Sequence, residues 1–232
     1  KIILENYDYP ENKIFHIPNG VDRNKFFPAK SESEICEIRK KLNIHENKTI
    51  LLFPGTNYKI KGISAILKTL LKLDSNNRNK IFVIAVGSTP GEKVLKEIKQ
   101  KNLHNCFRFD GHSENMRDYY IASDLLFFPT IYEPFANVCL EACACALPVL
   151  TTALNGSSEL ISNRENGFVI ESYADIDQMA SSIAEFLAFS KEKRAKFAES
   201  AFQATRGYEW NEHLNQLEKL LKSIYRSNIL NN

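Results

Sequence analysis

Two glutamates, Glu133 and Glu141, are separated by seven residues in the stretch Tyr132–Pro148, YEPFANVCLEACACALP. Pro134 disfavours helix at Glu133, whereas residues 137–146 have the pattern of a helix. One carboxylate should therefore lie on the loop at a helix mouth, and the other should project from that helix. Because backbone N–H groups at the start of a helix bind anions, the start of this helix is a predicted phosphate-binding site. Two carboxylates beside such a site suit a ligand with both phosphates and hydroxyls, such as a nucleotide-sugar.

A second group of residues, in Pro54–Gly62 (PGTNYKIKG), points to the same ligand. Gly55 follows an apolar run, where a glycine allows a tight turn and a close backbone approach. Lys59 and Lys61 then precede the next helix, where cations oppose the helix dipole unless an anion is bound. A diphosphate would resolve that conflict.

The histidines and cysteines offer less specific chemistry. His112 follows a predicted strand, and contact with a ligand and a plain loop position are equal alternatives. Of the five cysteines, Cys139, Cys143 and Cys145 share one helix and lack the spacing of a zinc site, so we interpret them as small buried hydrophobic residues. An odd number of cysteines without a secretion signal is typical of a reducing cytoplasm.

Short apolar runs that alternate with helical patterns must position these residues. This alternation predicts a doubly wound, Rossmann-like α/β fold with a parallel six-stranded sheet. In such sheets ligands bind at the carboxyl ends of the strands, where all the candidate loops fall. Residues 13–22 are predicted as a further short strand. The six sheet strands are expected at 49–55, 81–87, 106–111, 124–130, 148–152 and 167–170, and the helices at 32–43, 62–73, 92–101, 114–122, 137–146, 175–188, 191–203 and 210–225.

Composition limits the classes of function. The chain has 232 residues, of which 44% are hydrophobic, so it can form a substantial core. Its net charge of +2 gives no electrostatic case for nucleic acid. No apolar stretch approaches the length of a membrane span. The chain begins at Lys1 rather than Met, so we expect it to be a piece of a longer protein.

The motif around the two glutamates resembles the E-x7-E signature of retaining glycosyltransferases of family 4. Its usual form is close to EPFG-hydrophobic-x-x-LEA-x-A-x-GLPV, and the chain matches most of it. The family has a GT-B fold, and the resemblance implies that this chain is its carboxyl-terminal, donor-binding half. Residues 1–25 would be an interdomain lead-in, 26–205 the nucleotide-sugar-binding domain, and 206–232 a crossover helix with an exposed apolar patch. The matching residues are Glu133, Pro134, Phe135, Leu140, Glu141, Ala142, Ala144, Leu147, Pro148 and Val149.

The resemblance also implies roles for individual residues. Glu133 and Lys61 would be catalytic, Glu133 at the sugar and Lys61 at the donor diphosphate, while Glu141 would bind the ribose hydroxyls. Thr56 replaces the family's phosphate-binding arginine, and Ala136 and Ala146 replace glycines. We expect strain at Ala136 if that position needs a positive φ, and a packing variation at Ala146. The full set of expected donor-binding residues is Gly55, Lys59, Lys61, His112, Phe135, Ala136, Asn137, Val138 and Glu141.

The implied reaction is metal-independent transfer of a hexose, with retention, from a nucleotide diphosphate sugar to a saccharide or glycolipid. A UDP-sugar is the expected donor, no cofactor is expected, and the acceptor would bind through a missing amino-terminal domain. The chain alone should therefore bind the donor but catalyse sugar transfer poorly. The closest resemblance is to lipopolysaccharide-core α-glucosyltransferases, which implies cell-surface polysaccharide synthesis in the cytoplasm or at the inner face of the membrane. Two alternatives remain open: a nucleotide-sugar epimerase of GT-B architecture, and a non-catalytic nucleotide-sugar-binding domain.

Overall fold

The computed structural model describes residues 10–44 and 47–230, which form two compact units. One unit is Arg23–Arg206; the other combines the described residues up to Asp22 with those from Gly207 onward. The first nine residues of the expected lead-in, and the last two of the expected crossover helix, lie outside the described residues.

The larger unit is built on a six-stranded parallel sheet, as the sequence predicts. The central strands are apolar along their whole length because helices cover both faces of the sheet. In β1 the five residues between the two ends are buried, and in β4 all four are. The strands are β1 Thr49–Gly55, β2 Ile81–Gly87, β3 Phe107–Gly111, β4 Leu125–Phe128, β5 Val149–Thr152 and β6 Gly167–Ile170.

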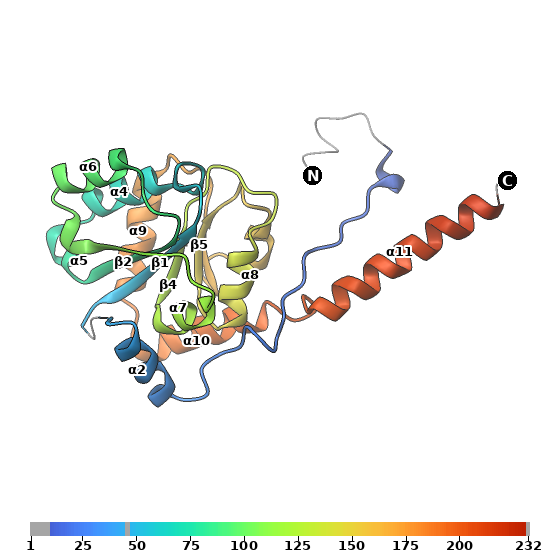
Figure 1. The fold of residues 1–232 in the computed structure, drawn as a ribbon, viewed down its shortest axis with the longest axis horizontal. Helices are drawn as coiled ribbons and strands as arrows, with labels where there is room; N and C mark the ends of the chain where they lie inside the picture. Colours follow the sequence, from blue (N-terminus) through green and yellow to red (C-terminus); the bar gives the residue numbers. More distant parts are fainter. Residues whose placement is uncertain (1–9, 45–46, 231–232) are drawn as a thin grey trace. The chain divides into compact units, whose positions relative to one another are not determined.

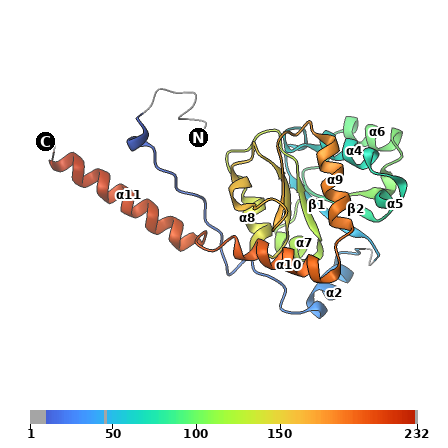
Figure 2. The same ribbon diagram turned by 180° about the vertical axis from the view of Figure 1, so that it is seen from behind.

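Helices flank the sheet on both sides (Figure 1). On one face α4 packs against α9, which Figure 2 shows from behind. On the other face α8 contacts both α7 and α10, and α2 packs on α7. The helices are α2 Glu32–Lys41, α3 Tyr58–Lys61, α4 Ile63–Lys72, α5 Ser75–Asn79, α6 Glu92–Gln100, α7 Met116–Ala122, α8 Asn137–Ala144, α9 Ile176–Leu187, α10 Lys191–Gln203 and α11 Trp210–Leu230; short 3₁₀ turns cover Glu11–Lys13, His104–Cys106 and Gly156–Leu160.

The strand order β3-β2-β1-β4-β5-β6 contains one reversal, between β1 and β4. From β1 the chain adds β2 and β3 in one direction, and then crosses back to place β4 on the other side of β1. The loops that leave β1 and β4 therefore diverge to opposite faces of the sheet and open a crevice at their carboxyl ends. In doubly wound proteins this point is where ligands bind.

Two local predictions are wrong. Residues 13–22 do not join a sheet; in the described chain Val21 forms an isolated bridge with Glu209. Pro18 lies within this segment and has no N–H to give a ladder. The polar stretch after α4, expected only to close that helix, forms the extra helix α5. Its start is stabilised by Asp74, whose carboxylate accepts from the Asn77 N–H at 2.9 Å.

The smaller unit is held together by main-chain bonds between its two segments. Val21 N–H donates to Tyr208 O at 2.8 Å, and Trp210 N–H donates to Val21 O at 3.1 Å. Apolar side chains along α11 are exposed, which confirms the predicted apolar patch. Each lies three or four residues from another of the set, which places them on one face of the helix. They are Leu214, Leu217, Leu221, Ile224 and Tyr225.

No helix among the described residues combines the length and the apolar character that crossing a bilayer requires.

Candidate functional site

A pocket of about 350 Å³ lies at the carboxyl ends of β1 and β4, at the point where the strand order reverses. The loop after β1, the end of β4 and the start of α8 contribute its walls. The residues that line it are Pro54, Gly55, Thr56, Lys61, Phe128, Glu133, Phe135, Ala136, Asn137 and Val138.

The charged centre of this pocket is an ion pair between Lys61 and Glu133. Each side chain is about one-fifth exposed, at 21% and 20%. Lys61 ends the short helix α3, and its ammonium lies 5.5 Å from the centre of the Phe128 ring. The pair joins a cation that suits a phosphate to a carboxylate that suits a hydroxyl.

The main chain holds Glu133 in place. Its N–H donates to Leu154 O at 3.2 Å, and its carbonyl accepts from Gly156 N–H at 2.8 Å. Gly156 lies so close to the motif loop that an added Cβ would stand 1.8 Å from Pro134 O. The loop at 154–156 therefore fixes the backbone that carries Glu133.

Asn155 supports the pocket from behind, although it is not among the donor-binding residues expected from the sequence. It is fully buried, and its Oδ1 accepts from Ala136 N–H at 3.3 Å and Ser157 Oγ at 2.9 Å. Its Nδ2 donates to Thr151 Oγ1 at 2.9 Å. The Ala136 N–H is therefore hydrogen-bonded within the protein. The backbone of Ala136 forms part of the pocket wall. The turn sequence Asn155-Gly156 was the available signal.

The start of α8 faces the pocket. Ala136, at the N-cap, makes no side-chain capping bond, and the first-turn residues Asn137 and Val138 line the pocket. The first-turn amides of a helix have no carbonyl one turn earlier to bond, and they carry the positive end of its dipole. This end of α8 can therefore bind an anion.

The two alanines that replace the motif's glycines differ from expectation. Ala136 has φ −82°, so the strain expected there is absent. Ala146 has φ +59°, so that position is strained rather than merely repacked. The left-handed conformation arises because the chain must turn from the end of α8 into Leu147-Pro148 and β5, a place where helices commonly have glycine.

Ala146→Gly should therefore stabilise the protein, while Ala136→Gly should destabilise it. Relief of the left-handed strain outweighs the entropy of the added glycine, for a net gain of about 0.5–1 kcal/mol. At position 136 the entropy cost of about 0.5–1 kcal/mol adds to the loss of a buried methyl group. Thermal unfolding of both variants should give shifts of opposite sign, each of about 1–4 °C. Shifts of the same sign would contradict these backbone conformations.

Glu141 lies one turn beyond the start of α8 and is not among the residues that line the pocket. Its Oε2 accepts a 2.7 Å hydrogen bond from the Tyr120 hydroxyl. Burial raises the pKa of Glu141, while the bond from Tyr120 and the charge of Lys25 oppose that rise. Burial and the Glu141 carboxylate raise the pKa of Tyr120 well above 10, so the phenol keeps its proton and donates it. Tyr120 was also missed, because nothing in the sequence separates it from the adjacent Tyr119.

The remaining predicted donor-binding residues divide into two groups. Gly55, Phe135, Ala136, Asn137 and Val138 lie together with Lys61 and Glu133 in the pocket. Lys59 and His112 are exposed and lie outside the lining. Thr56, at the family's arginine position, does line the pocket, so Lys61 is the cation among the lining residues.

The three cysteines of the motif helix are buried, as predicted. Burial raises the pKa of Cys139 to about 11 and that of Cys145 to about 12, so both thiols stay protonated at neutral pH. Within residues 10–44 and 47–230, no cluster of three or more His, Cys, Asp or Glu side chains is suited to hold a metal ion.

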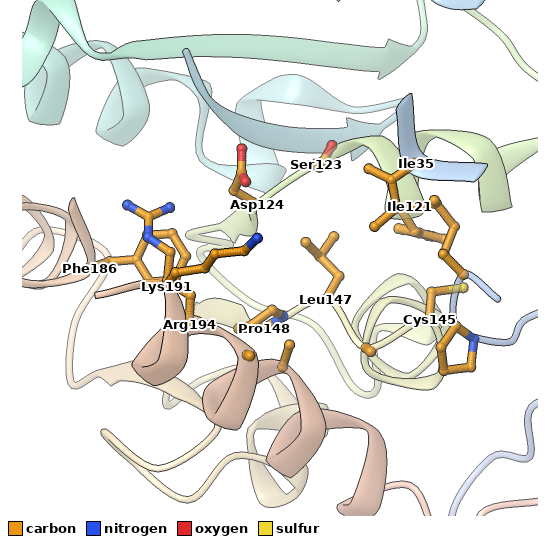
Figure 3. Close-up of a pocket in the computed structure, with 16 residues that line it drawn as sticks. Ile35, Ile121, Ser123, Asp124, Cys145, Leu147, Pro148, Phe186, Lys191 and Arg194 are labelled. Atoms are coloured by element: carbon orange, nitrogen blue, oxygen red, sulfur yellow. The ribbon is translucent and has the colours of Figure 1, made fainter. Parts of the chain in front are cut away.

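A second pocket, of about 390 Å³, opens at the opposite ends of the strands, their amino ends (Figure 3). Asp124 and Pro148, which precede β4 and β5, line it with Leu147, Lys191 and Arg194. Asp124 accepts from Arg39 Nη2 at 2.9 Å and from Ile50 N–H at 2.7 Å, so its carboxylate ties the edge of the sheet to α2. Since this pocket lies at the amino ends of the strands, the first pocket is the better candidate for the site.

The chain is a doubly wound parallel α/β protein with a pocket where the strand order reverses, the place where proteins of this class bind their ligands. Residues 34–204 match the model of the family described as glycosyl transferases group 1, and the chain belongs to that family. It is 24% identical over 231 residues to the D-inositol 3-phosphate glycosyltransferase of Corynebacterium jeikeium, covering 96% of this chain and 54% of that protein.

Two further comparisons are relevant to the site. The lipopolysaccharide glucosyltransferase WaaG of Escherichia coli is 25% identical over 166 residues, which covers 72% of this chain and 44% of WaaG. The structure of Anabaena HepE in complex with UDP and glucose matches 89% of this chain and 56% of its own with a TM-score of 0.78, at 22% identity, and so supports the fold. The chain spans about half the length of the curated relatives that it matches.

Proposed function

We propose that this chain is the donor-binding half of a retaining, metal-independent hexosyltransferase. The observation that carries the proposal is the convergence of Lys61, Glu133 and the start of α8 in one pocket at the reversal of the sheet. A cation and a helix start suit a diphosphate. The adjoining carboxylate suits the hydroxyls of a hexose.

Each residue takes a separate part of the donor in this proposal. Lys61 and the first turn of α8 bind the diphosphate and neutralise the charge that grows on it as the sugar leaves. Glu133 accepts hydrogen bonds from sugar hydroxyls, and Glu141, one turn along α8, accepts from the ribose. The departing phosphate takes the acceptor's proton on the same face of the sugar, which gives retention without a metal ion.

We infer that the donor is a UDP-sugar. The complex of Anabaena HepE with UDP and glucose, a protein of the same fold, supports this choice. The acceptor is a saccharide or glycolipid held by the part of the enzyme that lies outside this chain. The similarity to WaaG supports a role in lipopolysaccharide or other cell-surface polysaccharide synthesis. Such a role would place the enzyme in the cytoplasm, at the inner face of the membrane.

Ligand-induced stabilisation tests the proposal. UDP, GDP and ADP, each free and as hexose esters, should be compared by thermal unfolding of the chain. A bound nucleotide at about a hundred times its Kd adds roughly 2.7 kcal/mol, which for a domain of this size raises Tm by about 5–10 °C. Uridine nucleotides should stabilise the wild type and should stabilise Glu141→Ala much less. If no nucleotide stabilises the chain, the donor-domain proposal is wrong.

Assays of the full-length protein separate the remaining alternatives. An epimerase would convert a sugar nucleotide into its epimer without an acceptor, which nuclear magnetic resonance of the mixture detects. A non-catalytic domain would bind the donor, but the full-length protein would transfer no sugar. The replacement of the family's arginine by Thr56 in the pocket is the observation that favours this second case.

A further inference from the structure

The hydrogen bond between Tyr120 and Glu141 joins two helices, one of which, α8, begins at the candidate site. Tyr120 lies on α7 and Glu141 on α8, and the two helices pack together. The distance from the phenol oxygen to Glu141 Oε2 is 2.7 Å. Tyr120 is 1% exposed, and Phe26 packs edge-to-face on its ring at 5.9 Å between centroids. The Tyr120 hydroxyl is therefore held in one position, and it can hold the Glu141 carboxylate in one orientation.

We propose that Tyr120 is a positioning residue whose hydroxyl orients Glu141 toward the vicinal diol of a nucleotide's ribose. This inference rests on the proposed function, and it assigns a role to a residue that lines the second pocket rather than the candidate site. An ionised carboxylate has about four acceptor positions on its two oxygens. Tyr120 occupies one of them on Oε2, which leaves Oε1 and the other position on Oε2 for a pair of hydroxyls.

The surroundings of Glu141 explain why it needs such a partner. The carboxylate is largely withdrawn from water, and Lys25 and Tyr120 are the groups that favour its charged form. Lys25 is an exposed side chain and acts through its charge, without direction. Without the phenol the carboxylate would turn toward other donors or take up a proton, and in either case it would accept less well from a diol.

The neighbouring Tyr119 provides a matched control. It is also buried on α7, and its hydroxyl also donates to a carboxylate, Asp110 Oδ2 at 3.2 Å. Asp110 belongs to β3, at the edge of the sheet, and does not line the pocket. Removal of either hydroxyl costs the fold one buried hydrogen bond, but only Tyr120 is joined to Glu141.

The test measures the affinity of the chain for UDP and for 2′,3′-dideoxy-UDP by titration calorimetry. Tyr120→Phe should weaken UDP binding about tenfold, equivalent to about 1.4 kcal/mol, and leave binding of the dideoxy analogue unchanged. Tyr119→Phe should change neither affinity. In a Glu141→Ala background, Tyr120→Phe should have no further effect on UDP binding, because the interaction that it supports is already lost.

The outcomes separate this inference from the function on which it rests. If Tyr120→Phe weakens both ligands equally, or weakens neither, Tyr120 does not act through the ribose and the inference is overturned while donor binding stands. If the wild type binds no uridine nucleotide, the proposed function itself fails. Unfolding temperatures of both phenylalanine variants verify that each remains folded.

Discussion

Replacing Lys61 by alanine should weaken the binding of UDP about 10- to 100-fold, while Lys59→Ala should leave it within about twofold. A hydrogen bond between a charged donor and a buried acceptor contributes about 1.5–3 kcal/mol, which corresponds to this range. Lys61 lines the pocket beside Glu133, whereas Lys59 is exposed outside it. The two lysines lie on the same turn of α3 and have the same charge, so a general electrostatic effect would weaken binding equally in both variants.

Glu133→Gln should have the opposite effect on UDP. In the structure the Lys61 ammonium is paired with Glu133, so a diphosphate must displace a carboxylate to reach it. Partly exposed ion pairs contribute up to about 1 kcal/mol, so the glutamine variant should bind UDP about two- to fivefold more tightly. It should gain nothing further from the hexose of a UDP-sugar, because a carboxylate accepts more strongly from hydroxyls than an amide does. Weaker binding of UDP by this variant would show that the pair does not compete with phosphate.

The sequence predicts the sheet because the same pattern, an apolar run followed by a helix, is repeated along the chain. Each central strand is a continuous apolar run that ends at a glycine or a turn. These runs alternate along the chain with segments that have the pattern of a helix. All six strands are therefore found where the apolar runs predict them. Residues 13–22 carried a weaker signal of the same kind, but a strand also needs a partner with a free edge. An apolar run alone does not supply that information.

The sequence predicts site residues whose role follows from their place in a loop or near a helix start. It does not predict residues whose role depends on tertiary contacts. Glu133 and Lys61 could be paired from the loops that carry them, because parallel strands bring those loops to one edge. Asn155 and Tyr120 act through hydrogen bonds to residues 19 and 21 positions away in the chain. Ala146 shows the same limit for the backbone, since its positive φ depends on how the chain turns from α8 into β5.

Gly156→Ala should destabilise the protein by about 2–3 kcal/mol, because overpacking of a tight contact costs on the order of 1–3 kcal/mol. The new methyl group would meet the Pro134 carbonyl, which is rigid backbone and cannot move aside as a flexible side chain would. The φ angle of Gly156 is not in the left-handed region, so glycine is required here for space alone. Unfolding in urea should show the loss, and Tm should fall by about 5–10 °C.

The same substitution should also weaken donor binding, and this second effect distinguishes a site contact from an ordinary packing contact. Gly156 N–H bonds to Glu133 O, so a shift that accommodates the methyl group moves the backbone of Glu133 away from Lys61. We expect UDP-sugar affinity to fall at least tenfold, at a ligand concentration and temperature at which the variant is still folded.

Gly91→Ala is the matched control, because an added Cβ there meets nothing within 4 Å and its φ of −67° suits alanine. That variant should unfold within about 1 kcal/mol of the wild type, because alanine lowers the entropy of the unfolded chain but is a poorer N-cap for α6 than glycine. Its UDP-sugar affinity should not change. If Gly156→Ala behaves like Gly91→Ala in both measurements, the loop at 154–156 does not support Glu133, and the rigidity of the pocket must come from α8 alone.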